Sequence, residues 1–115
     1  MSIAERQIGA VTVIDLTGTL TLGAAADTMR DKVSSLLYQG QKHLLVNLEA
    51  VSYMDSAGLG ELVRAFATAN KQGGTLKLVN LTKRLQDLLV ITKLSNVFEC
   101  FDDEARAVRS FDAPV

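Results

Sequence analysis

Residues 43–60, HLLVNLEAVSYMDSAGLG, join two different sequence patterns. The apolar run 43–48 predicts a short strand that is buried on both faces. From Ser56 to Lys71 the apolar residues recur at helical spacing, which predicts a helix with one buried face. A buried strand, a short polar loop and an amphipathic helix are typical of an α/β sheet.

Strand and helix patterns also alternate on both sides of this stretch. Gly9 separates two runs that are rich in β-branched residues, which predicts an opening hairpin. We expect strands at residues 3–7, 10–17, 43–48, 75–80 and 97–101, and helices at residues 24–38, 56–71, 82–92 and 102–110. The prediction is one α/β domain over residues 1–115, with a mixed, mostly parallel sheet, an N-terminal hairpin and about four helices packed mainly on one side.

The composition excludes several classes of function. Lys and Arg number 12 against 13 Asp and Glu, so the chain lacks the dense positive field that nucleic acids require. No apolar run approaches the ~18 residues of a membrane span, and the N-terminus has no signal-peptide pattern. We therefore expect a cytoplasmic protein that binds neither nucleic acid nor membrane directly.

The single cysteine and the single histidine limit the chemistry further. Cys100 has no partner for an intramolecular disulfide, and its position between Phe98 and Phe101 predicts a buried, apolar cysteine. His43 and one distant cysteine cannot form a metal site, so we expect His43 at the surface or at a strand edge. We predict no metal and no cofactor.

Ser56 is the residue that carries the most chemistry. It lies between a predicted strand and a predicted helix, where loops of α/β sheets hold functional groups. Either Asp55 or Ser56 can cap the helix, and Gly58 and Gly60 allow another backbone to approach closely. A phosphate on Ser56 would meet the positive end of the helix dipole. The alternative is that the serine is an ordinary helix cap and that the glycines serve only tight packing.

Asp55-Ser56-Ala57-Gly58-Leu59-Gly60, directly after its apolar strand, resembles the signature of the STAS domain. More narrowly, it is similar to the anti-sigma factor antagonists of bacteria. The likeness covers nearly the whole chain, and further matching segments are the opening hairpin, Gly18-Thr19-Leu20, Gly73-Gly74 before Leu76-Lys77-Leu78-Val79, and the closing Leu94, Val97, Phe98 and Phe101.

The resemblance implies a binding module without catalytic activity. In this family, the serine that matches Ser56 is phosphorylated by a serine kinase that is also the anti-sigma factor. The unphosphorylated form binds that kinase and releases the sigma factor, and a serine phosphatase resets the switch. Asp55 would orient the serine, and Ala57, Gly58, Leu59 and Gly60 would belong to the docking surface.

One segment departs from the family pattern. Members commonly have Gly-Glu-Leu-Asp after the hairpin, where this chain has Gly18-Thr19-Leu20-Thr21. We expect this loop to lie close to Ser56, so Thr21 is included in the predicted partner-binding surface. Thr21 is either a plain loop threonine or a second phosphoacceptor.

Two other functions compete with the phosphoswitch. The same type of domain serves as a scaffold subunit of signalling assemblies, or as a cytosolic accessory of a membrane transporter. A small hydrolase that uses Ser56 and His43 is the other alternative, but Ser56 lacks the Gly-x-Ser-x-Gly motif. Phe111 either packs on the domain or marks a contact in a weak homodimer.

Overall fold

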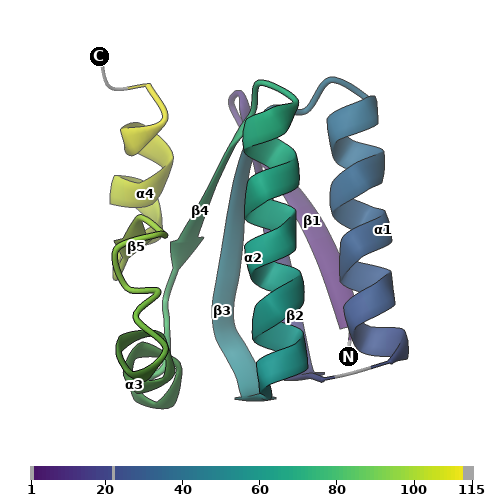
Figure 1. The fold of residues 1–115 in the computed structure, drawn as a ribbon. Helices are drawn as coiled ribbons and strands as arrows, with labels where there is room; N and C mark the ends of the chain where they lie inside the picture. The colour runs from purple at the N-terminus through teal and green to yellow at the C-terminus, as the bar shows by residue number, and fades with distance from the viewer. Residues whose placement is uncertain (1, 22, 113–115) are drawn as a thin grey trace.

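The computed structural model describes residues 2–21 and 23–112, which form one mixed sheet with helices on both faces (Figure 1). The sheet has five strands in the order β1-β2-β3-β4-β5, and only β1 runs antiparallel to its neighbour. The strands are β1 (Ser2–Ile8), β2 (Val11–Leu20), β3 (His43–Met54), β4 (Thr75–Val79) and β5 (Cys100–Phe101). The helices are α1 (Ala24–Tyr38), α2 (Ser56–Lys71), α3 (Lys83–Ile91) and α4 (Glu104–Ser110).

The predicted fold class is confirmed. Gly9 has a φ of 59°, as the tight turn between β1 and β2 requires, and these two strands form the expected hairpin. Three helices, α1, α2 and α3, pack on one face of the sheet over a large apolar core. The fourth helix, α4, covers part of the other face with a smaller core that includes Val13, Leu45 and Ala107.

Strand β3 is longer than the predicted strand 43–48. It continues to Met54 because the end of β2 pairs with it, with irregular register between Asp15 and Thr17 and between Gly18 and Thr19. At the other end of the sheet, β5 keeps only Cys100 and Phe101 of the predicted strand 97–101. The extension of β3 matters for function because it places the start of α2 at the carboxyl edge of the sheet.

Two predictions about single residues are wrong in part. Cys100 is exposed as a residue of the two-residue strand β5, although its thiol is partly buried and lies 3.7 Å from the carbonyl oxygen of Phe98. His43 is half-buried at the start of the central strand β3, and not at a sheet edge, because α4 folds back over it. Its ring stacks on Phe111 with 5.4 Å between ring centroids, so Phe111 packs on its own domain.

A polar cluster ties the hairpin to α4. The Arg6 guanidinium donates from Nε to Oδ2 of Asp15 at 2.6 Å and from Nη2 to Oδ1 at 3.0 Å, and it also contacts the carboxylate of Glu104. Asn47 Nδ2 donates to the same Asp15 carboxylate at 2.8 Å. Arg6, supported by Asn47, holds the pKa of Asp15 below its usual value, while the pKa of Arg6 is raised.

We expect Arg6→Ala to lower the free energy of unfolding by about 1 kcal/mol at neutral pH, because the pair is partly exposed. The folded-state pKa of Asp15 is depressed, so this stabilisation is complete above the ordinary carboxyl pKa of about 3.9 and is lost as the pH falls through the lower folded value. Urea denaturation between pH 7 and pH 3 measures the difference. If the difference in the free energy of unfolding between wild type and Arg6→Ala stayed constant below pH 4, the assignment of the stabilisation to the Arg6–Asp15 pair would be contradicted.

Candidate functional site

The candidate site lies where β2 and β3 end side by side. Leu20, the last residue of β2, pairs with Met54, the last residue of β3. The backbone N–H of Asp55 then donates to the carbonyl oxygen of Leu20 at 3.3 Å. The loop between β3 and α2 is therefore a single residue, and Ser56 is already the first residue of the helix. This geometry fixes Ser56 between two rigid elements.

Asp55, and not Ser56, caps helix α2. Its backbone is extended, and its carboxylate Oδ1 accepts a hydrogen bond from the N–H of Gly58 at 2.8 Å. The side chain of Ser56 is exposed, and within the described residues its hydroxyl makes no hydrogen bond. Of the two capping residues that the sequence allows, the structure selects Asp55. Ser56 is left accessible, with no structural role that its hydroxyl fulfils.

Asp55→Ala is therefore expected to lower the free energy of unfolding by about 1 kcal/mol, the usual loss for a removed N-cap. Ser56→Ala is the matched control, and we expect it to change stability by less than about 0.5 kcal/mol. Urea denaturation measures both. If Ser56→Ala were the more destabilising change, Ser56 would have a structural role that these contacts do not show.

The two glycines of the motif have different roles. A Cβ added to Gly58 would lie 2.0 Å from the carbonyl oxygen of Leu20, so only glycine fits where α2 begins against β2. A Cβ added to Gly60 would meet nothing within 4 Å, and Gly60 is exposed. Gly58 thus serves tight packing, which was the alternative interpretation, whereas Gly60 leaves a bare stretch of helix surface one turn after Ser56.

The remaining residues of the predicted docking surface also differ in whether they are buried in the core or accessible to a partner. Leu59 is only 4% exposed and belongs to the apolar core, so its side chain is not available to a partner. Ala57 is half-buried, and Thr21 is half-buried directly after the end of β2. Because Leu20 bonds to Asp55, Thr21 follows at the same edge of the sheet as Ser56, as expected from the sequence. Residue 22, which comes next in that loop, lies outside the described residues.

Tyr53 is a surface residue of this edge that the sequence analysis did not single out. Its side chain is 46% exposed, and it pairs with Thr19 at the end of β2. Exposed aromatic side chains are frequent anchors of protein–protein interfaces. A strict alternation of buried and exposed residues along β3 would have predicted which side chains face the solvent. That alternation fails here, because the register between β2 and β3 shifts and both Ser52 and Tyr53 are exposed.

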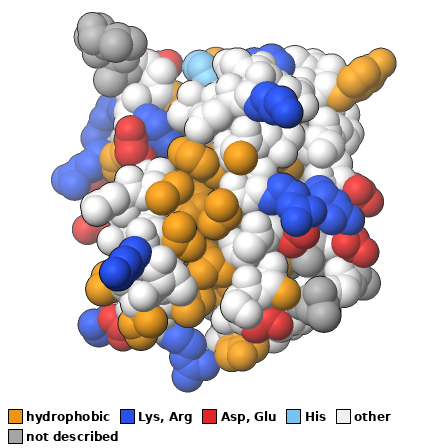
Figure 2. Space-filling model, viewed as in Figure 1, with side chains coloured by type: hydrophobic (Ala, Val, Ile, Leu, Met, Phe, Trp, Pro, Cys, Tyr) orange, Lys and Arg blue, Asp and Glu red, His pale blue; other side chains and the backbone are white. Residues whose placement is uncertain are grey.

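Charged side chains join α2 to α1 beside the site. Arg30 of α1 contacts Asp27 at 2.7 Å and Glu61 of α2 at 3.4 Å, and Arg64 contacts the same Glu61 at 3.6 Å. Figure 2 shows Lys and Arg side chains next to Asp and Glu side chains over these two helices, and a hydrophobic stripe where α2 faces the α3 side. These contacts hold the helix that carries Ser56 against its neighbour.

The ranges 2–21 and 23–112 contain neither a cluster of metal ligands nor a helix that could cross a membrane. No group of three or more His, Cys, Asp and Glu side chains in these ranges is arranged to hold a metal ion. No helix there has the length and apolar character needed to cross a membrane.

These features define a class of protein: an α/β domain that presents an exposed serine at the first residue of a helix. The chain belongs to the STAS domain family, whose model matches residues 2–107. It is 45% identical to the anti-sigma-B factor antagonist of Bacillus subtilis (strain 168) over 75 residues, 65% of this chain and 68% of that protein. It is 23% identical to the anti-sigma F factor antagonist of Paenibacillus polymyxa over 103 residues, 89% of this chain and 87% of that protein.

Solved structures share the fold. The anti-sigma factor antagonist SpoIIAA in its unphosphorylated form has a TM-score of 0.74 at 22% identity, covering 98% of this chain and all of the other (100%). SpoIIAA of Bacillus in its phosphorylated form has a TM-score of 0.75 at 22% identity, with 96% and 99% covered. An anti-sigma factor antagonist from Mycobacterium paratuberculosis has a TM-score of 0.82 at 17% identity, with 97% and 94% covered. The predicted resemblance to STAS domains and anti-sigma factor antagonists is confirmed.

Proposed function

We propose that this protein is an anti-sigma factor antagonist whose switch is the phosphorylation of Ser56. The unmodified form binds an anti-sigma serine kinase in the cytoplasm and thereby releases a sigma factor. Phosphorylation by that kinase ends the binding, and a serine phosphatase restores it. The observation that carries the proposal is the exposed hydroxyl of Ser56 at the first position of α2, which has no hydrogen-bond partner among residues 2–21 and 23–112 and lies next to a cap that Asp55 already provides.

The helix start is suited to a phosphoryl group. The backbone N–H groups of Ser56 and Ala57 make no hydrogen bond among the residues that the structure describes, while that of Gly58 is taken by Asp55. Free N–H groups and the helix dipole stabilise an anion there. The phosphorylated form therefore keeps its fold, and the modification acts on the partner.

The same phosphoryl group opposes binding. It adds about −1.5 to −2 charges directly beside the carboxylate of Asp55. A partner surface that is complementary to a neutral serine and the bare helix at Gly60 would have to bury this charge without a counter-ion. The relatives support the proposal, because they are named anti-sigma factor antagonists and SpoIIAA exists in both phosphorylation states.

A pull-down tests this function. Wild type, Ser56→Ala and Ser56→Asp serve as baits in lysate of the source organism, and mass spectrometry identifies the captured proteins. We expect an ATP-dependent serine kinase with wild type and with Ser56→Ala, and its loss with Ser56→Asp. The same large assembly or membrane transporter on all three baits would contradict the switch and would support a scaffold function.

A further inference from the structure

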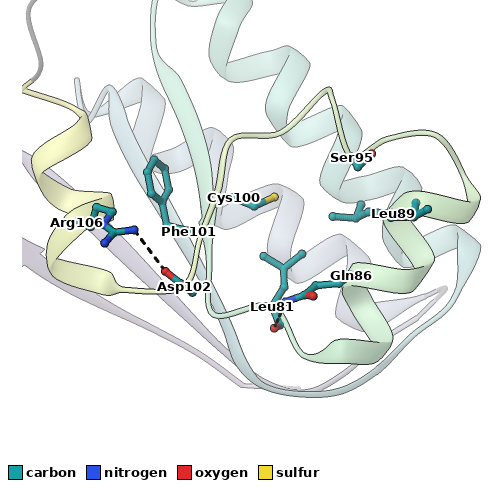
Figure 3. Close-up of a pocket in the computed structure, with 9 residues that line it drawn as sticks. Leu81, Gln86, Leu89, Ser95, Cys100, Phe101, Asp102 and Arg106 are labelled. Carbon is teal, nitrogen blue, oxygen red and sulfur yellow. Dashed lines mark hydrogen bonds and ion pairs between the residues drawn. The ribbon is translucent and has the colours of Figure 1, made fainter.

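A groove beside α3 is lined by residues of α3, β5 and the start of α4, and the proposed switch does not use it. It has a volume of about 410 Å³ and lies between α3, β5 and the start of α4 (Figure 3). This volume falls in the range of about 300–1,000 Å³ that small-molecule sites occupy. Its apolar wall consists of Leu81, Leu89, Val90 and Phe101.

Part of this apolar wall is exposed to water, which is unfavourable for apolar side chains. Val90 is 63% exposed, and its neighbour Ile91 is 77% exposed, although both are large apolar side chains. Of these two residues, Val90 lines the groove, so its exposed apolar surface is available for a ligand to cover. The wall therefore fits a molecule with an apolar body.

The polar part of the groove includes the cationic side chain of Arg106. Arg106 contacts Asp102 at 3.9 Å, and both side chains are largely exposed, so solvent weakens this pair. The Arg106 guanidinium makes no hydrogen bond within the described part of the chain. In Figure 3 its dashed contact to Asp102 lies on the α4 side of the groove, and the Cys100 thiol points toward α3. Desolvation raises the pKa of that thiol, so it is neutral at pH 7.

We propose that this groove binds a small organic carboxylate, with its apolar body against Leu81 and Val90 and its carboxylate on Arg106. A guanidinium binds a carboxylate through paired, charge-assisted hydrogen bonds, for which Arg106 has the donors available. The site does not depend on the phosphoswitch, and neither the family match nor the named relatives assign a ligand to it.

Cys100 provides a direct readout of occupancy, because it is the only cysteine in the chain and it lines the groove. We would measure the rate of its alkylation by iodoacetamide in the full-length protein with increasing sodium octanoate. We expect octanoate to slow alkylation at least fivefold at saturation. The matched alcohol 1-octanol, which lacks the carboxylate, is expected to protect Cys100 with an apparent Kd about tenfold higher than that of octanoate.

Three variants make the assignment specific. Arg106→Gln is expected to weaken octanoate binding about tenfold, and Asp102→Asn to strengthen it, since the competing carboxylate is removed. Arg109→Gln, which removes a positive charge from the same helix outside the groove, should leave the apparent Kd unchanged. Equal protection of wild type and Arg106→Gln, or no protection by octanoate at millimolar concentrations, would overturn the proposal.

Discussion

Gly58→Ala is expected to lower the free energy of unfolding by more than about 3 kcal/mol. The added methyl group would lie 2.0 Å from the carbonyl oxygen of Leu20, 2.7 Å from its carbonyl carbon and 3.0 Å from its Cγ. Two of these atoms are backbone at the end of β2, and the same carbonyl accepts the hydrogen bond from Asp55. The strand end and the helix start cannot separate without the loss of that bond.

Gly60→Ala is the matched control, two residues further along the same helix. Its Cβ would meet nothing within 4 Å, and alanine is favoured over glycine inside a helix by about 0.5–1 kcal/mol. We therefore expect this variant to be slightly more stable than wild type in urea denaturation. If the two variants lost similar amounts of stability, the close contact of Gly58 with Leu20 would not explain the glycine.

Gly60→Ala also separates folding from docking. Because it leaves the fold intact, any loss of kinase binding would come from the surface that the methyl group changes. We expect weaker binding if the partner backbone approaches α2 at this position.

Ser56→Asp is expected to weaken binding of the anti-sigma kinase at least about 100-fold, since a buried charge without a counter-ion costs a few kcal/mol. The variant should not lose stability. Helix α2 has no acidic residue in its first turn, and a carboxylate at that end interacts favourably with the helix dipole. A loss of kinase binding with an unchanged unfolding midpoint would show that the charge acts on the interface and not on the fold. If Ser56 had only a structural role, the unfolding midpoint would fall as well.

Ser34→Asp is the matched control for charge. Ser34 is an exposed serine in the C-terminal half of α1. Figure 1 shows that the C-terminal end of α1 and the start of α2 lie at opposite ends of this pair of helices. The same chemical change there is expected to leave kinase binding within about twofold of wild type. Equal weakening by both aspartates would indicate a general charge effect and would contradict a specific role for Ser56.

The sequence was sufficient to predict the order of elements and the position of the candidate serine. Helix α1 over 24–38 and helix α2 over 56–71 have the predicted bounds, because their apolar residues recur at helical spacing and glycines mark their ends. The hairpin at Gly9 was predictable because its turn needs a positive φ. These features depend on local chemistry, which a single sequence contains.

Features that depend on long-range packing were not predictable. The division between Gly58 and Gly60 depends on the carbonyl of Leu20, which is 38 residues away from Gly58 in the chain. Leu59 was assigned to a docking surface, but its side chain completes the core beneath α2. Cys100 was expected to be buried by its aromatic neighbours, yet the short β5 leaves it exposed in a groove. No local sequence pattern predicts this groove.

Calorimetry with the purified kinase tests the central claim most directly. The titrants are the unmodified protein, the Ser56→Ala variant and protein that carries phosphate on Ser56 alone, verified by mass spectrometry. We predict that the unmodified protein and Ser56→Ala bind with similar Kd and that phosphorylation raises Kd at least about 100-fold. Equal Kd values for the phosphorylated and unmodified forms would contradict a phosphoswitch at Ser56.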